Sequence, residues 1–129
     1  QGETRVLDVA EQQAVLQAAL TAYHAPDVVV LGMGMDGHTA SLFADAPQFA
    51  AAMDRHQAQP LMIVEPPSAP YARISMTLAA ILQAKTLYIA AYGAQKQALL
   101  QQALLTEEAL LPITWVLQEA QDVPVHVFG

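Results

Sequence analysis

The sequence contains no cysteine and few basic residues. Without cysteine, disulfide bonds, thiolate metal ligands and thiol redox chemistry are all excluded. Twelve acidic side chains stand against five basic ones, which gives a formal charge of -7, and the arginines and lysines are scattered along the chain. Duplex nucleic acid requires a basic face, so we expect no nucleic-acid partner. An anionic ligand would have to draw its cationic contacts from a very short set of side chains.

Long apolar runs are also absent. No stretch approaches the roughly 18 uncharged apolar residues of a membrane span, although 54% of the 129 residues are hydrophobic. We therefore expect no membrane partner. The first residues, QGETRVLDVAEQQ, lack the basic and apolar regions of a secretory signal, and we expect an unexported, cytoplasmic protein. A chain of this length can bury one core, which predicts a single domain over residues 1–129.

Helical and extended patterns alternate along the chain. Apolar residues at helical spacing predict an amphipathic helix over residues 8–23. Continuous apolar runs predict a strand at 28–31 that is buried on both faces and another buried strand at 87–92. The other predicted elements are strands at 61–64 and 123–128, an extended segment at 73–77, helices at 78–84 and 94–105, a short helix at 39–43, and a loop around Pro112.

This alternation predicts an α/β fold, with a mostly parallel sheet flanked by helices in Rossmann-like layers. Ligands bind such sheets outside the carboxyl ends of the strands. We therefore expect the loops after Leu31 and Tyr92 to lie on the same rim.

The first of these loops carries the glycine pattern G-x-G-x-x-G, within VVVLGMGMDGHTASLF at residues 28–43. Taken alone, this pattern is typical of dinucleotide binding. Three features oppose that function. Asp36 places a carboxylate where phosphates would bind, Pro47 interrupts the following helix, and Glu65 lies beyond the roughly 20 residues at which a ribose-binding acid is expected.

The same loop contains a candidate general base. If His38 lies in the first turn of a helix, the helix dipole disfavours the imidazolium form and leaves a neutral ring that can accept a proton. Asp36 can accept the other ring N–H and fix the tautomer and orientation. The alternative is structural: Asp36 and Thr39 cap a helix, and His38 is an ordinary surface residue.

Lys96 and Arg73 are the candidate anion ligands. Lys96 falls in the first turn of the predicted helix 94–105, where a cation is unfavourable unless an anion binds beside it. Arg73 follows a proline-rich loop. Either side chain can instead be a solvated surface residue. The remaining histidines, His24, His56 and His126, have no partner at metal-ligand spacing, so no metal site is predicted.

Three ordered blocks of sequence resemble the 6-phosphogluconolactonases, which share a superfamily with the glucosamine-6-phosphate isomerases. The blocks are GMGMDGHTASLF at 32–43, RISMTL at 73–78 and YGAQK at 92–96. The related isomerases and deaminases usually continue the D-G-H core with an I-A-F-N-E-P type sequence, whereas this chain continues with T-A-S-L-F. The resemblance therefore favours the lactonase branch.

The resemblance implies hydrolysis of 6-phosphoglucono-1,5-lactone to 6-phosphogluconate, in the oxidative pentose phosphate pathway, without a metal or organic cofactor. His38 would correspond to the base that activates water, and Asp36 to its supporting carboxylate. The implied substrate-binding residues are Gly34, Gly37, Arg73 and Lys96.

One departure from the family affects this expectation. Family members are longer, and their amino-terminal part carries a phosphate loop of S-G-G-S-T type that nothing in residues 1–27 matches. The chain thus resembles the carboxyl-terminal portion of a lactonase, with an incomplete version of the family fold. We expect weak or no activity from the chain alone, and self-association through an exposed sheet edge and apolar face. A non-catalytic sugar-phosphate binding module is the alternative.

Overall fold

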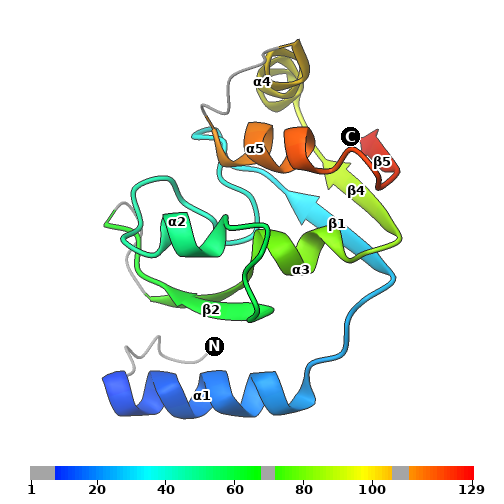
Figure 1. The fold of residues 1–129 in the computed structure, drawn as a ribbon. Helices are drawn as coiled ribbons and strands as arrows, with labels where there is room; N and C mark the ends of the chain where they lie inside the picture. Colours follow the sequence, from blue (N-terminus) through cyan, green and yellow to red (C-terminus); the bar gives the residue numbers. More distant parts are fainter. Residues whose placement is uncertain (1–7, 68–71, 106–110) are drawn as a thin grey trace, which may run out of the picture.

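The structure is a computed structural model and describes residues 8–67, 72–105 and 111–129. Helices and strands alternate along most of the chain, which confirms the α/β class (Figure 1). The elements are α1 (Val9–Ala22), β1 (Val28–Gly32), α2 (Phe49–Ala52), β2 (Leu61–Val64), β3 (Arg73–Met76), α3 (Leu78–Leu82), β4 (Thr86–Ala90), α4 (Ala94–Leu105), α5 (Pro112–Glu119) and β5 (Val125–Phe128).

Three strands form a parallel sheet in the order β1-β4-β5, and β2 and β3 form a separate antiparallel pair. Gly32 at the end of β1 lies opposite Ala90 at the end of β4. The loops that follow these two strands therefore leave the same edge of the sheet, as predicted. This edge carries the glycine loop and the start of α4.

Helices α3, α4 and α5 pack on one face of the parallel sheet. Leu31 of β1 and Leu87 of β4 are buried, together with residues of α3 and α5. Ile89 of β4 is buried in a second cluster, with residues of α4 and α5. Burial of these side chains supplies the main driving force for this layer.

The opposite face of the sheet is open, so the prediction that residues 28–31 are buried on both faces is wrong. Val28 and Val30 are 53% and 60% exposed, while Val29 and Leu31 between them are buried. Tyr88 of β4 is likewise only partly buried. A continuous apolar run is typical of a strand that is covered on both faces. Among the described residues, however, no helix covers this second face.

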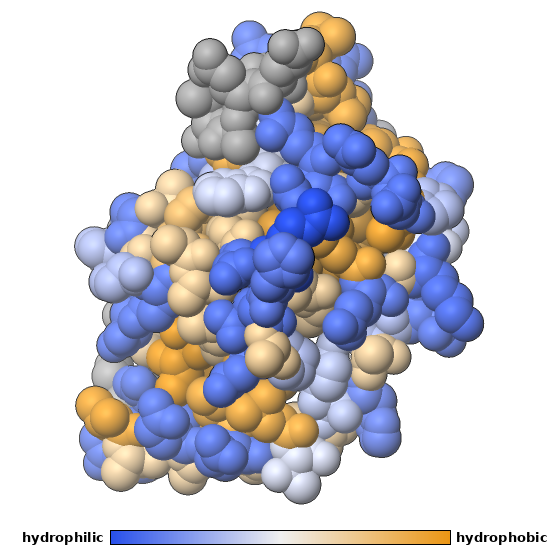
Figure 2. Space-filling view, viewed as in Figure 1, coloured by the Kyte–Doolittle hydropathy of each residue, from blue (hydrophilic) through white to orange (hydrophobic). Residues whose placement is uncertain are grey.

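Helix α1 starts at a capping box, in which the side chain of Asp8 accepts the backbone N–H of Glu11 and the side chain of Glu11 accepts that of Asp8. Only Leu16 of the predicted apolar stripe is buried, and Val9 is 72% exposed. The helix lies below the rest of the chain in Figure 1, and apolar surface is visible along it in Figure 2. No helix in the described segments is long and apolar enough to cross a membrane.

Two local predictions are wrong. Residues 39–43 form turns with an isolated bridge between Thr39 and Leu42, because Ala40 has a left-handed φ of 51° that a helix does not allow. The segment around Pro112 is not a loop but the start of α5, with Pro112 in its first turn. Proline is favoured there, since the missing N–H has no partner within the helix.

Candidate active site

The D-G-H segment forms a closed loop at the carboxyl end of β1. The N–H of Gly37 donates to the carbonyl of Gly34 at 3.0 Å, and the N–H of Gly34 donates to the carbonyl of His38 at 2.9 Å. Gly37 has a φ of +82°, which favours glycine over residues with a side chain. The hydroxyl of buried Thr39 donates to the carbonyl of Gly32 at 2.7 Å and ties the loop to the strand.

Asp36 and His38 form a pair within this loop. Nδ1 of His38 lies 2.5 Å from Oδ1 of Asp36, and the backbone N–H of His38 donates to the same oxygen at 3.1 Å. Because an ionised carboxylate only accepts hydrogen bonds, the proton of the bond lies on Nδ1. In a neutral ring Nε2 is then the basic nitrogen, and it has no hydrogen-bond partner among the described residues.

Both side chains reach solvent, with 31% of His38 and 55% of Asp36 exposed. Burial acts to raise the pKa of Asp36, but the hydrogen bonds and the charge of His38 outweigh it, so the pKa is lowered from its ordinary value. The carboxylate is therefore ionised at neutral pH. Residues 39–43 form turns and not a helix, so the prediction that His38 lies in the first turn of a helix is wrong.

Phe43 lies against the imidazole, a contact that was not predicted from the sequence. The two ring centroids are 4.2 Å apart with an angle of 19° between the planes, an arrangement typical of stacked rings. The guanidinium carbon of Arg73 lies 5.3 Å from the centroid of the Phe43 ring, within the range of a cation–π contact. The structure thus brings Arg73 to the loop through Phe43. An aromatic residue five positions after the histidine was the available signal.

Two further contacts hold the loop from distant parts of the chain. The N–H of Ser41 donates at 3.0 Å to the hydroxyl of Ser75, a buried residue of β3. The N–H of Ile113, at the start of α5, donates at 2.9 Å to the carbonyl of Gly37. Neither residue was singled out from the sequence, because their roles depend on contacts between segments far apart in the chain.

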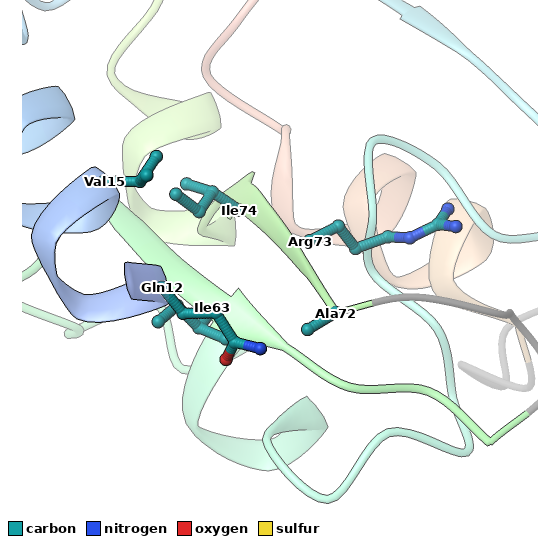
Figure 3. Close-up of a pocket in the computed structure, with 6 residues that line it drawn as sticks. All are labelled: Gln12, Val15, Ile63, Ala72, Arg73 and Ile74. Atoms are coloured by element: carbon teal, nitrogen blue, oxygen red, sulfur yellow. The ribbon is translucent and has the colours of Figure 1, made fainter. Parts of the chain in front are cut away.

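Arg73 also borders a hollow of about 190 Å³ between α1 and the β2-β3 pair. Figure 3 shows the guanidinium pointing away from the other residues that line this hollow, among them Gln12 and Ile63. The charged group of Arg73 therefore lies near Phe43 and does not point into the hollow.

Lys96 lies in the first turn of α4, as predicted, and the residue is half-buried. Within the described segments it has no hydrogen bond or ion pair, with His38 and Asp36 or with any other residue. The structure places Lys96 at the same sheet edge as the D-G-H loop, because β1 and β4 are parallel neighbours. Among the described residues, no hydrogen bond or ion pair joins Lys96 to this loop.

The described residues contain no cluster of three or more His, Cys, Asp and Glu side chains that could hold a metal ion. The glycine loop also lacks the long helix that a dinucleotide-binding loop places beneath the pyrophosphate, since residues 39–47 form turns and α2 has four residues. A β-carbon at Gly34 would overlap the imidazole of His38. This glycine therefore makes room for a side chain of the chain itself.

The fold and the site define an α/β protein with a carboxylate–histidine pair at the carboxyl edge of a parallel sheet. The family described as glucosamine-6-phosphate isomerases/6-phosphogluconolactonase matches residues 2–125. The chain belongs to this family.

Curated relatives in this family are named 6-phosphogluconolactonase. The protein of Neisseria meningitidis serogroup A is 46% identical over 115 residues, which cover 89% of this chain and 49% of the relative. That of Helicobacter pylori strain 26695 is 32% identical, with 92% and 50% covered. The chain thus spans about half the length of these curated relatives.

Solved structures give the same result. A structure described as a putative 6-phosphogluconolactonase from Neisseria gonorrhoeae has a TM-score of 0.83 at 46% identity, with 90% of this chain and 50% of that one covered. A 6-phosphogluconolactonase from Shewanella baltica has a TM-score of 0.77 at 34% identity, with 92% and 50% covered. The α/β fold described above therefore matches about half of each of these family structures.

Proposed function

We propose that the chain carries the general-base site of a 6-phosphogluconolactonase, which hydrolyses 6-phosphoglucono-1,5-lactone to 6-phosphogluconate in the oxidative pentose phosphate pathway. One observation carries the proposal: a carboxylate-supported imidazole at the carboxyl edge of a parallel sheet, in a chain whose relatives at 46% identity are named for this activity. The continuation T-A-S-L-F after the histidine also favours the lactonase over the isomerase branch.

In the proposed reaction, Nε2 of His38 takes a proton from water while the water oxygen attacks the lactone carbonyl carbon. Asp36 keeps the other proton on Nδ1 and stabilises the imidazolium that forms. When the tetrahedral intermediate collapses, the bond from the carbonyl carbon to the ring oxygen breaks, and the proton passes from Nε2 to that oxygen. The sugar ring opens to the acid, and His38 returns to its neutral form.

Arg73 and Lys96 supply the positive charge for this substrate. The chain has only five arginines and lysines, and these two belong to elements that flank the loop or share its sheet edge. We assign them to the substrate phosphate or to the negative charge that develops on the carbonyl oxygen. Gly34 and Gly37 complete the proposed binding loop by shaping it, since a β-carbon at Gly34 would overlap the imidazole of His38 and one at Gly37 would overlap the side chain of Leu111.

We further propose that residues 1–129 act as one cytoplasmic domain that associates with a second copy of itself. The uncovered sheet face supports this proposal. It carries a shallow apolar hollow of about 500 Å³ lined by Val28, Val30, Tyr88, His126, Val127 and Phe128. Both β1 and β5 are also edge strands of the parallel sheet. Open edges and contiguous apolar faces are typical sites of association.

The function is tested by following hydrolysis of freshly prepared 6-phosphogluconolactone, corrected for the spontaneous reaction. Since the chain spans half the length of its relatives, we expect turnover to be weak. His38→Ala is expected to remove the protein-dependent part, a loss of roughly 10²-fold or more if His38 is the general base. His24→Ala, which alters an exposed histidine outside the loop, is the matched control. Equal rates for the chain and its His38→Ala variant would refute the proposal.

A further inference from the structure

Phe43 is a buried aromatic residue that contacts two of the proposed functional groups. It is 5% exposed, its ring is stacked on His38, and its centroid lies 5.3 Å from the guanidinium carbon of Arg73. One core side chain thus touches both the imidazole and a cation of the proposed site.

The hydrogen bond to Asp36 fixes only part of the orientation of His38. It holds Nδ1 beside the carboxylate, but rotation about the bond from Cβ to the ring is broad in histidine. A hydrogen bond also tolerates donor angles down to about 150° with little loss. The tilt of the ring, and with it the direction of Nε2, therefore needs a second constraint.

The stack with Phe43 provides that constraint. The angle of 19° between the planes can be kept only while the imidazole remains nearly parallel to the Phe43 ring. The imidazole also lies close to Gly34, where a β-carbon would overlap Cε1 and Nδ1. Phe43 itself is held in the core next to Leu42, which is 1% exposed.

We propose that Phe43 is a positioning residue for His38: its ring sets the plane of the imidazole and so aims Nε2 at the attacking water. The inference rests on the proposed lactonase function. A base that tilts away from the reacting water loses turnover more than substrate affinity. We expect loss of the Phe43 ring to lower kcat about tenfold while KM stays within about twofold.

The stack can be measured without any enzymatic activity, by NMR of the histidine ring protons in the 129-residue chain. A proton above an aromatic ring is shifted upfield, so the His38 signals, assigned with His38→Gln, should lie upfield of those of His24 and His56. Phe43→Leu should remove the shift and Phe43→Tyr should keep it. Phe43→Met, which also lacks a ring, replaces the leucine variant if that variant does not fold.

Phe49→Leu is the matched control. Phe49 is a partly buried aromatic residue packed against the core, and its ring meets Trp115 edge-on at 5.5 Å, so its loss should leave the His38 signals in place. Wild-type His38 signals without an upfield shift, or signals unchanged in folded Phe43→Leu, would overturn the inference.

The kinetic arm separates this inference from the proposed function. A tenfold loss of kcat in Phe43→Leu, retained activity in Phe43→Tyr and unchanged KM support the positioning role. An unchanged kcat in a variant that has lost the ring shift overturns it. If the wild-type chain shows the ring shift but no protein-dependent hydrolysis, the stack is supported and the proposed activity of this chain is contradicted.

Discussion

The backbone N–H of Ile113 donates a hydrogen bond of 2.9 Å to the carbonyl oxygen of Gly37. This bond joins the start of α5 to the loop that carries Asp36 and His38. It satisfies one of the N–H groups that the first turn of a helix leaves without a partner. The side chain of Leu111 packs beside it, so a β-carbon at Gly37 would lie 2.7 Å from Cβ of Leu111. Helix α5 therefore holds the proposed catalytic loop in place.

Gly37→Ala is expected to destabilise the fold for two reasons. The left-handed φ of +82° is unfavourable for alanine, and the added methyl group meets Leu111. Together these effects should lower the free energy of unfolding by about 2–3 kcal/mol. Urea unfolding followed by the fluorescence of Trp115 measures the change.

Two other glycines separate these causes. Gly93 has a φ of +94° with no atom within 4 Å of an added β-carbon, so Gly93→Ala reports backbone strain alone, about 1 kcal/mol. Gly32 has neither a positive φ nor a close neighbour, and Gly32→Ala should stay within about 0.5 kcal/mol of the parent. A Gly37→Ala variant no less stable than Gly93→Ala would show that the Leu111 contact is unimportant.

Asp36→Asn is expected to remove most of the lactonase activity while the loop stays folded. The amide cannot stabilise the imidazolium as a carboxylate does, and it can donate to Nδ1 and so favour the wrong tautomer. A loss of roughly 10²- to 10⁴-fold in kcat is expected in an assay of lactone hydrolysis. Asp54→Asn is a close control, because Asp54 accepts the backbone N–H of His56 in a similar turn at 2.9 Å. Comparable losses in the two variants would contradict the assignment of Asp36.

The lowered pKa of Asp36 makes stability depend on acid pH. Because the carboxyl binds its proton more weakly in the folded chain, the unfolded state holds more protons, and the free energy of unfolding falls as the pH is lowered. The contribution is fully present above the ordinary aspartate pKa of 3.8 and is lost as the pH falls through the lower folded value. The free energy of unfolding in urea, measured between about pH 6 and pH 2, gives this contribution, because the range spans the ordinary aspartate pKa of about 4.

Asp36→Asn should flatten this part of the pH profile, since the amide does not titrate. The effect is small, because more than half of the Asp36 side chain is exposed to solvent. A profile of the same shape in the parent and the variant would show that the pair with His38 does not contribute to acid sensitivity.

Val30→Lys is expected to weaken self-association. Val30 is 60% exposed and lies in the middle of β1, an edge strand, on the uncovered face of the sheet. A charge there would have to be buried between two copies. Light scattering at increasing protein concentration should show larger assemblies for the parent chain and a shift toward monomer for the variant. Val15→Lys on α1, 46% exposed, controls for added charge. A parent chain that is monomeric at high concentration would contradict the proposed self-association.

The sequence by itself determined the order of the main elements, the edge where the glycine loop lies, and the proximity of Asp36 to His38. Each of these depends on local information. The apolar run at residues 28–31 predicts a strand, and the apolar stripe at 94–105 predicts a helix. A separation of two residues in a tight glycine loop places the carboxylate of Asp36 close to the imidazole of His38. These features follow from spacing and chain geometry, which the sequence carries directly.

Only the tertiary structure decided the rest. Phe43 stacks on His38 because the left-handed turn at Ala40 folds the chain back where a short helix was expected. Ser75 and Ile113 hold the loop from other elements. Val30 is exposed, although the apolar run around it is typical of a strand buried on both faces. The physical reason is that contacts between distant segments, and the layers that do or do not cover a face, depend on how the whole chain packs. Among these features only Phe43, five residues after His38, left a local signal in the sequence.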